Sequence, residues 1–291
     1  MNQKLKLYMK SLIGLFYRKL YGPHVYALIT KTENGLFAVD PEDLAVGRQL
    51  RKHGKYGMDE IQRLSNHVTS SSKVLIVGAH IGTLAIPISK LCSKVVCIEA
   101  NPNTYELFTK NLALNEASNC QAINIAASNK EERIQFLLSR TNSGGSKRVP
   151  KVKDYIYYYD SPTEVSVNAF SLDNYLVEKD FDVVIMDIEG SEYFALQGMQ
   201  EILATAKVLA VEFLPHHLRN VSCATVDQFV SLIAPHFSLL TIPSKNVTIA
   251  TNEFLDYLSD MYKKNEEDDA LIFAKAEAFN PTGLNQSNTP R

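Results

Sequence analysis

The stretch Val74–Glu99 constrains the fold more than any other part of the chain. It contains an apolar strand, a turn with Gly78 and Gly82, a helix of apolar periodicity, a second apolar strand and a final acid, Glu99. Glycines at such a turn let the backbone pass close to a ligand, where a Cβ would intrude. An acid about twenty residues after the glycines is placed to accept both hydroxyls of a ribose. This order of elements therefore predicts a pocket for an adenosine-containing cofactor.

The turn departs from the dinucleotide pattern Gly-x-Gly-x-x-Gly, in which backbone amides at a helix N-terminus hold a pyrophosphate. Its middle glycine is absent, and Ala79, His80 and Ile81 stand between Gly78 and Gly82. We therefore expect a nucleoside without a pyrophosphate, which favours S-adenosylmethionine over NAD. The bulky His80 side chain must point into or across the pocket, so it joins the two glycines as a candidate cofactor-binding residue.

From residue 71 to 276 the chain alternates apolar strands with amphipathic helices. Several strands are uninterrupted apolar runs, which are typical of a parallel sheet covered on both faces. The alternation predicts an α/β fold with a doubly wound, mostly parallel, seven-stranded Rossmann-like sheet. The expected strands lie near 74–77, 94–99, 121–126, 181–187, 207–213, 237–242 and 270–275, and the expected helices near 82–91, 102–115, 191–204 and 224–235.

Residues 1–70 are predicted to form an N-terminal extension with a hairpin over 25–30 and 35–39 and helices over 4–21, 40–53 and 58–67. The first helix is amphipathic and rich in lysine. Such a helix packs on its own domain or on a partner subunit, including a second copy of the chain, or lies on an anionic membrane surface.

Three further segments interrupt the strand and helix pattern. The Gly- and Ser-rich residues 139–149 predict a mobile loop. The tyrosine-rich residues 154–160 are either plain structure or a lid over a substrate. Residues 277–291 hold too few apolar side chains to order themselves, which predicts a disordered tail.

Two acids directly follow the apolar strand expected at 181–187. Side chains beyond the carboxyl ends of parallel strands line the ligand crevice, so we expect Asp187 and Glu189 to face the same cleft as the turn Gly78–Gly82, with Asp187 also a candidate cofactor-binding residue. Adjacent carboxylates raise each other's pKa, which suits a general base, or bind a divalent metal. Ser191 and Glu192 are better explained as helix capping.

Further candidates follow the other strands. Glu212 lies within an apolar strand, where an ionisable group needs a partner or a function. Together with Asp187 it offers oxygen ligands for Mg²⁺ or Mn²⁺, and His216 just beyond it is a candidate proton acceptor. Asn101 is placed to reach the ribose or adenine, or to serve as an ordinary turn residue before a proline. Ala127 leaves room for a flat adenine ring.

Five segments resemble in this order the FkbM-type methyltransferases: VLIVGAHIGTLAI, VVCIEANPNTYELFTKNLALNE, INIAASNKEERIQF, LDNYLVEKDFDVVIMDIEGSEYFALQGM and VLAVEFLPH. The resemblance covers about residues 35–275, and its most specific part is Asp-x-Glu-Gly-x-Glu before an apolar helix. It implies S-adenosylmethionine-dependent O-methylation of a hydroxyl on a sugar, glycan, lipid or secondary metabolite. It also implies a cofactor loop, a ribose acid and an acidic cleft, which match here Gly78, His80, Gly82, Glu99, Asp187, Glu189 and Glu212.

Composition restricts the function classes. The net charge of −2 lacks the basic excess of a nucleic-acid-binding domain, and no apolar run reaches the roughly 20 residues that cross a bilayer. The four cysteines form no Cys-x-x-Cys pair, which predicts free thiols in a reducing compartment. We therefore expect a cytoplasmic enzyme, free or peripheral to a membrane, that acts on a small-molecule or glycan acceptor with a free hydroxyl.

Two alternatives to the O-methyltransferase stay open. One is a non-catalytic, nucleoside-binding adaptor of the same fold, motivated by Ile76, which replaces an acid that the family usually has before its Val-Gly. The other is an NAD-dependent oxidoreductase. Within the leading hypothesis Asp187, Glu189 or His216 removes the proton of the acceptor hydroxyl. The sequence leaves open which of them does so, whether a metal assists, the acceptor itself and the oligomeric state.

Overall fold

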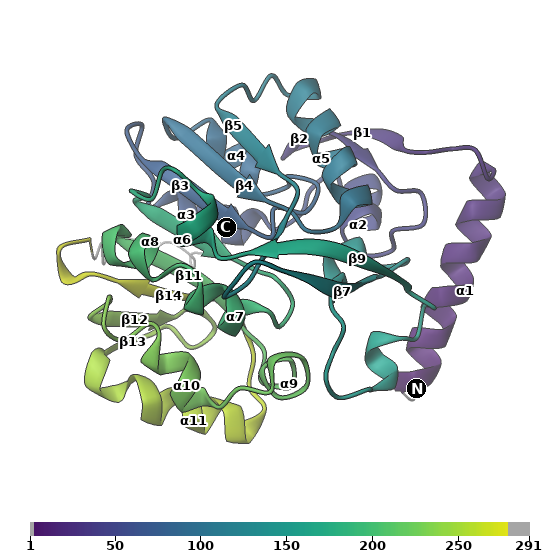
Figure 1. The fold of residues 1–291 in the computed structure, drawn as a ribbon. Coiled ribbons are helices and arrows are strands. Elements are labelled where there is room, and N and C mark those ends of the chain that lie inside the picture. Colours follow the sequence, from purple (N-terminus) through teal and green to yellow (C-terminus); the bar gives the residue numbers. More distant parts are fainter. Residues whose placement is uncertain (1–2, 279–291) are drawn as a thin grey trace, which may run out of the picture.

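The computed structural model describes residues 3–278, so the predicted tail lies outside the described residues except for its first two. An eight-stranded sheet forms the centre of the molecule, in the order β13-β12-β14-β11-β10-β3-β4-β5 (Figure 1). Its strands are β3 (Lys73–Val77), β4 (Lys94–Ile98), β5 (Cys120–Ile123), β10 (Val183–Met186), β11 (Val208–Phe213), β12 (Leu239–Ile242), β13 (Val247–Ala250) and β14 (Asp268–Ala274).

The strands from β11 to β5 run parallel, whereas β14 is antiparallel to both β11 and β12, and β13 is antiparallel to β12. The predicted Rossmann-like α/β fold is therefore confirmed. Each of the seven expected strands has its counterpart, and β13 is an eighth strand that the sequence pattern did not indicate.

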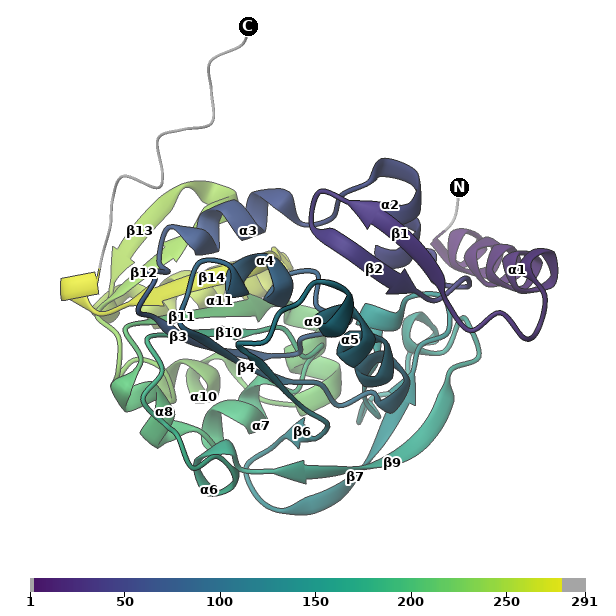
Figure 2. The ribbon, with the colours of Figure 1, turned by 90° about the horizontal axis from the view of Figure 1, so that it is seen from above.

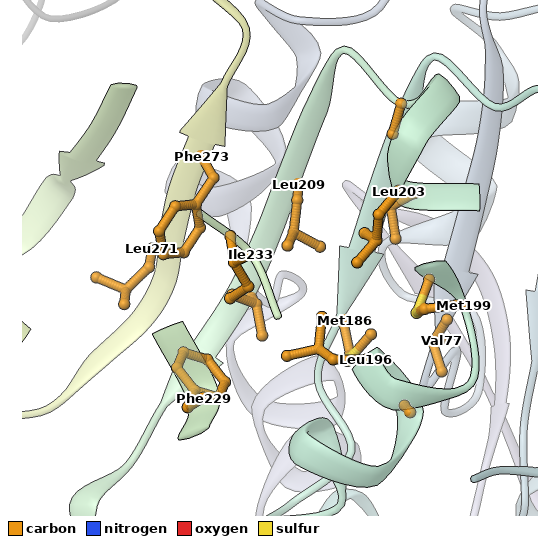
Figure 3. Packing of buried hydrophobic residues seen from close by; sticks show 14 of the residues in the cluster. Val77, Met186, Leu196, Met199, Leu203, Leu209, Phe229, Ile233, Leu271 and Phe273 are labelled. Atoms are coloured by element: carbon orange, nitrogen blue, oxygen red, sulfur yellow. The ribbon is translucent and has the colours of Figure 1, made fainter. Parts of the chain in front are cut away.

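Helices cover both faces of this sheet because successive side chains of each buried strand point to opposite sides. Val74 and Ile76 face one core, while Leu75 and Val77 face the other. The first core is closed by α3 (Met58–Ser65), α4 (Ala85–Ser89) and α5 (Pro102–Leu114). The second, part of which Figure 3 shows, is closed by α6 (Leu172–Tyr175), α7 (Glu192–Gln197), α8 (Gln200–Thr205), α10 (Val226–Ser231) and α11 (Phe254–Lys264).

Two of the predicted helices differ from the observed ones. The helix expected over 191–204 is divided into α7 and α8 at Gly198, where a Cβ would come within 2.0 Å of the carbonyl oxygen of Ser128. The helix expected from residue 40 begins only at Val46, as α2 (Val46–His53). The preceding aspartates form turns instead, because Asp40 and Asp43 each accept a hydrogen bond from the backbone amide two residues on.

A second, four-stranded sheet lies between β5 and β10 in the sequence and was not predicted. Its order is β6-β9-β7-β8, and the long antiparallel pair β7 and β9 extends away from the central sheet (Figure 2). Its strands are β6 (Ala126–Ala127), β7 (Glu132–Leu138), β8 (Lys147–Arg148) and β9 (Thr163–Phe170). The segment 139–149, which was expected to be a mobile loop, contains β8 and a short 3-10 helix, η1 (Ser143–Gly145).

The N-terminal extension consists of α1 (Gln3–Tyr21), the hairpin β1 (Leu28–Thr32) and β2 (Gly35–Val39), and α2. Asn111 of α5 and Asn115, which follows its last residue, bind the hairpin through its backbone, since each carboxamide oxygen accepts from an amide of β2. Phe37 also packs in one cluster with Ile81 and Ile86 of the central domain. The predicted domain boundary at residue 70 stays a prediction, and apolar packing is continuous across it.

We predict that Gly78→Ala destabilises the protein far more than Gly22→Ala. Both glycines have left-handed backbones, with φ of +96° and +95°. A Cβ at Gly78 would lie 1.7 Å from the carbonyl oxygen of Asp187, whereas a Cβ at Gly22 would have no neighbouring atom within 4 Å. We expect a cost of about 3 kcal/mol or more at Gly78 and about 1 kcal/mol at Gly22 in denaturant titrations. Equal losses would contradict the close approach of the two strands.

Candidate active site

A cavity of about 390 Å³ lies at the carboxyl ends of β3, β4, β10 and β11. The loops that follow these strands bring together side chains from distant parts of the sequence, as the parallel topology predicts. Of the residues predicted for the site, seven line the cavity: Gly78, His80, Glu99, Ala127, Asp187, Glu189 and Glu212.

Glu99 lies at the apolar end of the cavity. Its Oε2 accepts a hydrogen bond from the backbone amide of His80, and its Oε1 accepts one from that of Asn101, both at 2.8 Å. Burial raises the pKa of this carboxyl to about 7, although the backbone amides around it lower it. The adjoining wall is formed by the apolar side chains of Ile125, Ala126, Ala127, Ile134 and Phe136. A buried acid beside apolar lining residues fits an adenosine, because the acid matches the ribose hydroxyls and the apolar wall matches the base.

Two predicted cofactor residues do not line the cavity. Gly82 serves the packing of the helix layer, because a Cβ there would lie 2.7 Å from the ring of Phe108. Asn101 caps α5, since its Oδ1 accepts from the amides of Asn103 and Thr104 at 3.0 and 3.3 Å. Of its two predicted alternatives, the structure shows the turn and capping role.

His80 points across the cavity, as expected. Its Nε2 lies 2.7 Å from Oγ of Ser143, which donates in turn to Oδ2 of Asp43 at 2.5 Å. Ser143 therefore accepts from the Nε2–H of His80. Burial lowers the pKa of His80 to about 4, so the ring is neutral at pH 7. This hydrogen bond connects the turn Gly78–Gly82 to the segment 139–149.

That segment supplies a wall of the cavity that sequence reasoning missed. Asn142, Ser143, Gly144 and Ser146 all line it. Their small polar side chains carry no spacing signal that distinguishes a cavity wall from a solvated loop. Their position in the cavity wall depends on a tertiary contact, the one between Ser143 and His80.

The opposite end of the cavity is acidic. Asp187 is accessible from the cavity, where burial and then the charges of Glu189 and Glu192 raise its pKa well above the usual range. The pKa of Glu212 is raised in the same way, by burial first and then by Asp187. Glu60 of α3 adds a further carboxyl, whose pKa burial raises to about 6. These groups repel one another and favour the binding of positive charge.

Lys147 of β8 provides the positive charge at this end. Its Nζ lies 2.7 Å from Oε2 of Glu189 and 3.0 Å from Nε2 of His217. Glu189, Glu212 and His217 are the described residues whose ligand atoms gather within 4.8 Å, and Asp187 is not among them. Because the ammonium already lies against two of these three side chains, the cluster does not fit a divalent ion. The predicted Mg²⁺ or Mn²⁺ site on Asp187 and Glu212 is therefore not supported.

The structure places His217, not His216, in this cluster. Burial, and then Lys147, lower the pKa of His217 and keep its ring neutral. His216 lies outside the cavity lining, with its Nδ1 3.3 Å from Glu267 and its ring stacked on Tyr157. None of the tyrosines of 154–160 lines the cavity either, so Tyr157 acts here as packing for the two histidines.

Comparison with known proteins places this geometry in a family. A family model described as the methyltransferase FkbM domain matches residues 77–239, more than half of the chain. Among solved structures, the chain is similar to a methyltransferase FkbM from Methylobacillus flagellatus KT, with 16% identity, a TM-score of 0.38 and coverage of 70% of this chain and 44% of that one. No curated protein matches the sequence.

Two archaeal structures are similar at the same level. One is the M. jannaschii tRNA m1G37 methyltransferase, with 16% identity, a TM-score of 0.43 and coverage of 87% and 58% of the two chains. The other is M. jannaschii TYW2 in complex with AdoMet, with 14% identity, a TM-score of 0.41 and coverage of 86% and 85%. The chain thus spans about half the length of the FkbM structure and of the tRNA m1G37 enzyme.

We predict that Lys147→Met lowers the free energy of unfolding by about 3 kcal/mol, because it leaves the carboxylate of Glu189 in a largely buried site without its counter-charge. The side chains of this pair are only 9% and 19% exposed. Lys110→Met is the matched control, since Lys110 pairs with Glu106 on the surface of α5 and its loss should cost less than about 1 kcal/mol. Denaturant titration measures both, and similar losses would contradict a buried pair.

Proposed function

Because the chain belongs to the FkbM methyltransferase family, as the match over residues 77–239 shows, we propose that it is an O-methyltransferase. Family and fold are those of an S-adenosylmethionine-dependent methyltransferase. The proposed acceptor is a hydroxyl of a sugar, glycan, lipid or secondary metabolite. The observation that carries the proposal is one cavity with an adenosine-shaped end at Glu99 and a carboxylate of raised pKa, Asp187, at the other end.

The apolar end of the cavity suits the cofactor. Glu99 would accept the two ribose hydroxyls, and the apolar wall at Ala127 would contact the adenine. When bound, S-adenosylmethionine supplies a methyl group on a positively charged sulfonium. The carboxylates at the acidic end complement this positive charge, and the turn at Gly78 permits close approach of the backbone.

Asp187 is the best placed of the three predicted bases. Glu189 is held in its ion pair with Lys147, and His216 lies outside the lining. Asp187 is accessible from the cavity and takes part in no ion pair among the residues that the structure describes. A carboxylate of raised pKa is a stronger proton acceptor than an ordinary one, which suits the removal of a hydroxyl proton.

The charge of the cavity also bears on the acceptor class. Glu60, Asp187, Glu189, Glu212 and Asp269 all line its acidic end. Carboxylates accept hydrogen bonds from hydroxyls, as a polyhydroxylated acceptor would require. They would repel the phosphates of a nucleic acid, which supports a small-molecule or glycan acceptor instead.

We predict that Glu99→Gln weakens binding of S-adenosylmethionine by about 10- to 100-fold at pH 8, because a charged acceptor of two hydroxyl hydrogen bonds is lost. The pKa of Glu99 is raised to about 7, so the carboxylate forms as the pH rises through this value. Wild-type affinity should therefore fall as the pH drops from 8 to 6, whereas the variant should show no such dependence. Titration calorimetry measures both.

The control for this experiment is Glu106→Gln, which changes an exposed acid of α5 away from the cavity and should bind as the wild type does. Equal affinities of Glu99→Gln and Glu106→Gln would remove the ribose role from Glu99. Failure of the wild-type chain to bind S-adenosylmethionine at all would overturn the proposed function.

We predict that Asp187→Asn lowers kcat for methyl transfer by about 10²- to 10⁴-fold, while cofactor affinity falls far less because the other carboxylates of the acidic end remain. Transfer of labelled methyl to a panel of hydroxylated acceptors identifies the acceptor with the wild type and then measures the variant. Wild-type activity should fall as the pH drops through the raised pKa of Asp187, because the protonated carboxyl cannot accept a proton. Full activity of the variant would exclude this role, and cofactor binding without any transfer by the wild type would favour the adaptor.

The same substitution separates catalysis from folding. A carboxyl whose pKa is raised in the folded state destabilises that state once the pH exceeds the pKa of the unfolded chain. Asp187→Asn should therefore raise Tm at pH 8, but only slightly because the side chain is open to solvent, and the gain should vanish in acid. A loss of activity together with a lower Tm would indicate misfolding instead.

A further inference from the structure

Helix α1 carries a continuous apolar face that no part of the described chain covers. Leu5, Met9, Leu12, Phe16 and Leu20 follow one another at intervals of three and four residues, so they share one side of the helix. Their exposed fractions run from 41% at Leu12 to 62% at Phe16. We call these five residues the outer face of α1. Tyr8, Ile13 and Leu15 beside them are also exposed.

The opposite side of α1 fixes the orientation of the helix. Gly14 is its only buried residue, and a Cβ there would lie 2.7 Å from Cγ2 of Thr141, so the helix backbone rests directly on the body of the protein. On the same side, Ser11 accepts from Arg140 at 2.8 Å and Arg18 donates to Glu42 at 2.7 Å. The outer face therefore points away from the body, and α1 lies along the outside of the molecule in both views (Figures 1 and 2).

The charges of α1 are of one sign. The helix Gln3–Tyr21 contains five lysines and arginines and no acid. Lys6 and Lys10 lie on one flank of the outer face and Lys19 on the other, and all three are exposed. Lysine stems of this kind lie along an apolar surface while their ammonium groups reach the charged layer next to it.

We propose that the outer face of α1 is a docking surface for an anionic lipid membrane, with the helix lying in the plane of the interface. An apolar stripe flanked by lysines matches the two layers of such a surface, acyl chains below and anionic headgroups above. A second copy of the chain is a poorer occupant, because two such helices would bring their lysines together without an acid between them. No helix among residues 3–278 is long and apolar enough to cross a bilayer, so the proposed attachment is to one leaflet.

The test is flotation of the full-length chain with vesicles of phosphatidylcholine alone or mixed with phosphatidylglycerol. We expect binding to the mixed vesicles, weakened by added salt. Leu12→Ser/Phe16→Ser should reduce the bound fraction at least about tenfold, because two large apolar side chains no longer insert. Lys6→Glu/Lys10→Glu should remove the preference for the anionic lipid.

The matched control is Ile29→Ser/Val177→Ser, which replaces two exposed apolar residues away from α1 and should bind vesicles as the wild type does. Unchanged affinity for S-adenosylmethionine and unchanged Tm show that each variant is folded. Absence of wild-type binding to both vesicles, or equal binding by all variants, would overturn the proposal. So would a dimer that Leu12→Ser/Phe16→Ser dissociates in a chain that binds no vesicle, since the face would then belong to a second copy.

Discussion

The cavity depends on one close approach between two strand ends, at Gly78 and Asp187. The carbonyl of Asp187 occupies the space where a side chain of residue 78 would stand, and its amide donates to the carbonyl of Val77 at 3.0 Å. The amide of Gly78 donates in turn to Ile98, at the end of β4. These hydrogen bonds connect β10, β3 and β4 at their carboxyl ends. Glu99, the turn Gly78–Gly82 and Asp187 therefore surround a single cavity.

At the acidic end of that space, repulsion between carboxylates is opposed by one ion pair. Carboxylates that repel one another in a buried site cost stability, and one ammonium, that of Lys147, offsets part of this cost by pairing with Glu189. Asp187 is left without such a pair, and burial together with the charges of Glu189 and Glu192 raises its pKa. One carboxylate is thereby neutralised by an ammonium while another, that of Asp187, has no such partner, which fits the base role proposed for it.

The features that could be predicted from the sequence are those that depend on the local pattern of apolar and polar residues. The strand and helix alternation, Glu99 after β4 and Asp187 after β10 follow from periodicity and from the topology of parallel sheets. The sheet of β7 and β9 was missed although both strands alternate: Ile134 and Phe136 follow polar residues in β7, and Val165, Val167 and Ala169 do so in β9. The places of Lys147 and Ser143 could not be predicted from local pattern, because they depend on how that sheet folds back over the cavity. His217 replaces His216 in the acidic cluster because the chain enters a short helix, α9 (Pro215–His217), which turns successive side chains to different sides.

The attachment of α1 explains why its outer face stays free. Polar contacts help to hold the helix on the body: Glu42 accepts from Arg18 at 2.7 Å and from Arg140 at 3.2 Å. The next residue, Asp43, accepts from Ser143, which contacts the turn Gly78–Gly82 through His80. The apolar side chains of the outer face take no part in these contacts. A contiguous stripe of exposed apolar side chains is typical of a docking surface, and the contacts of Glu42 and of the neighbouring Asp43 connect α1 with the segment that lines the cavity.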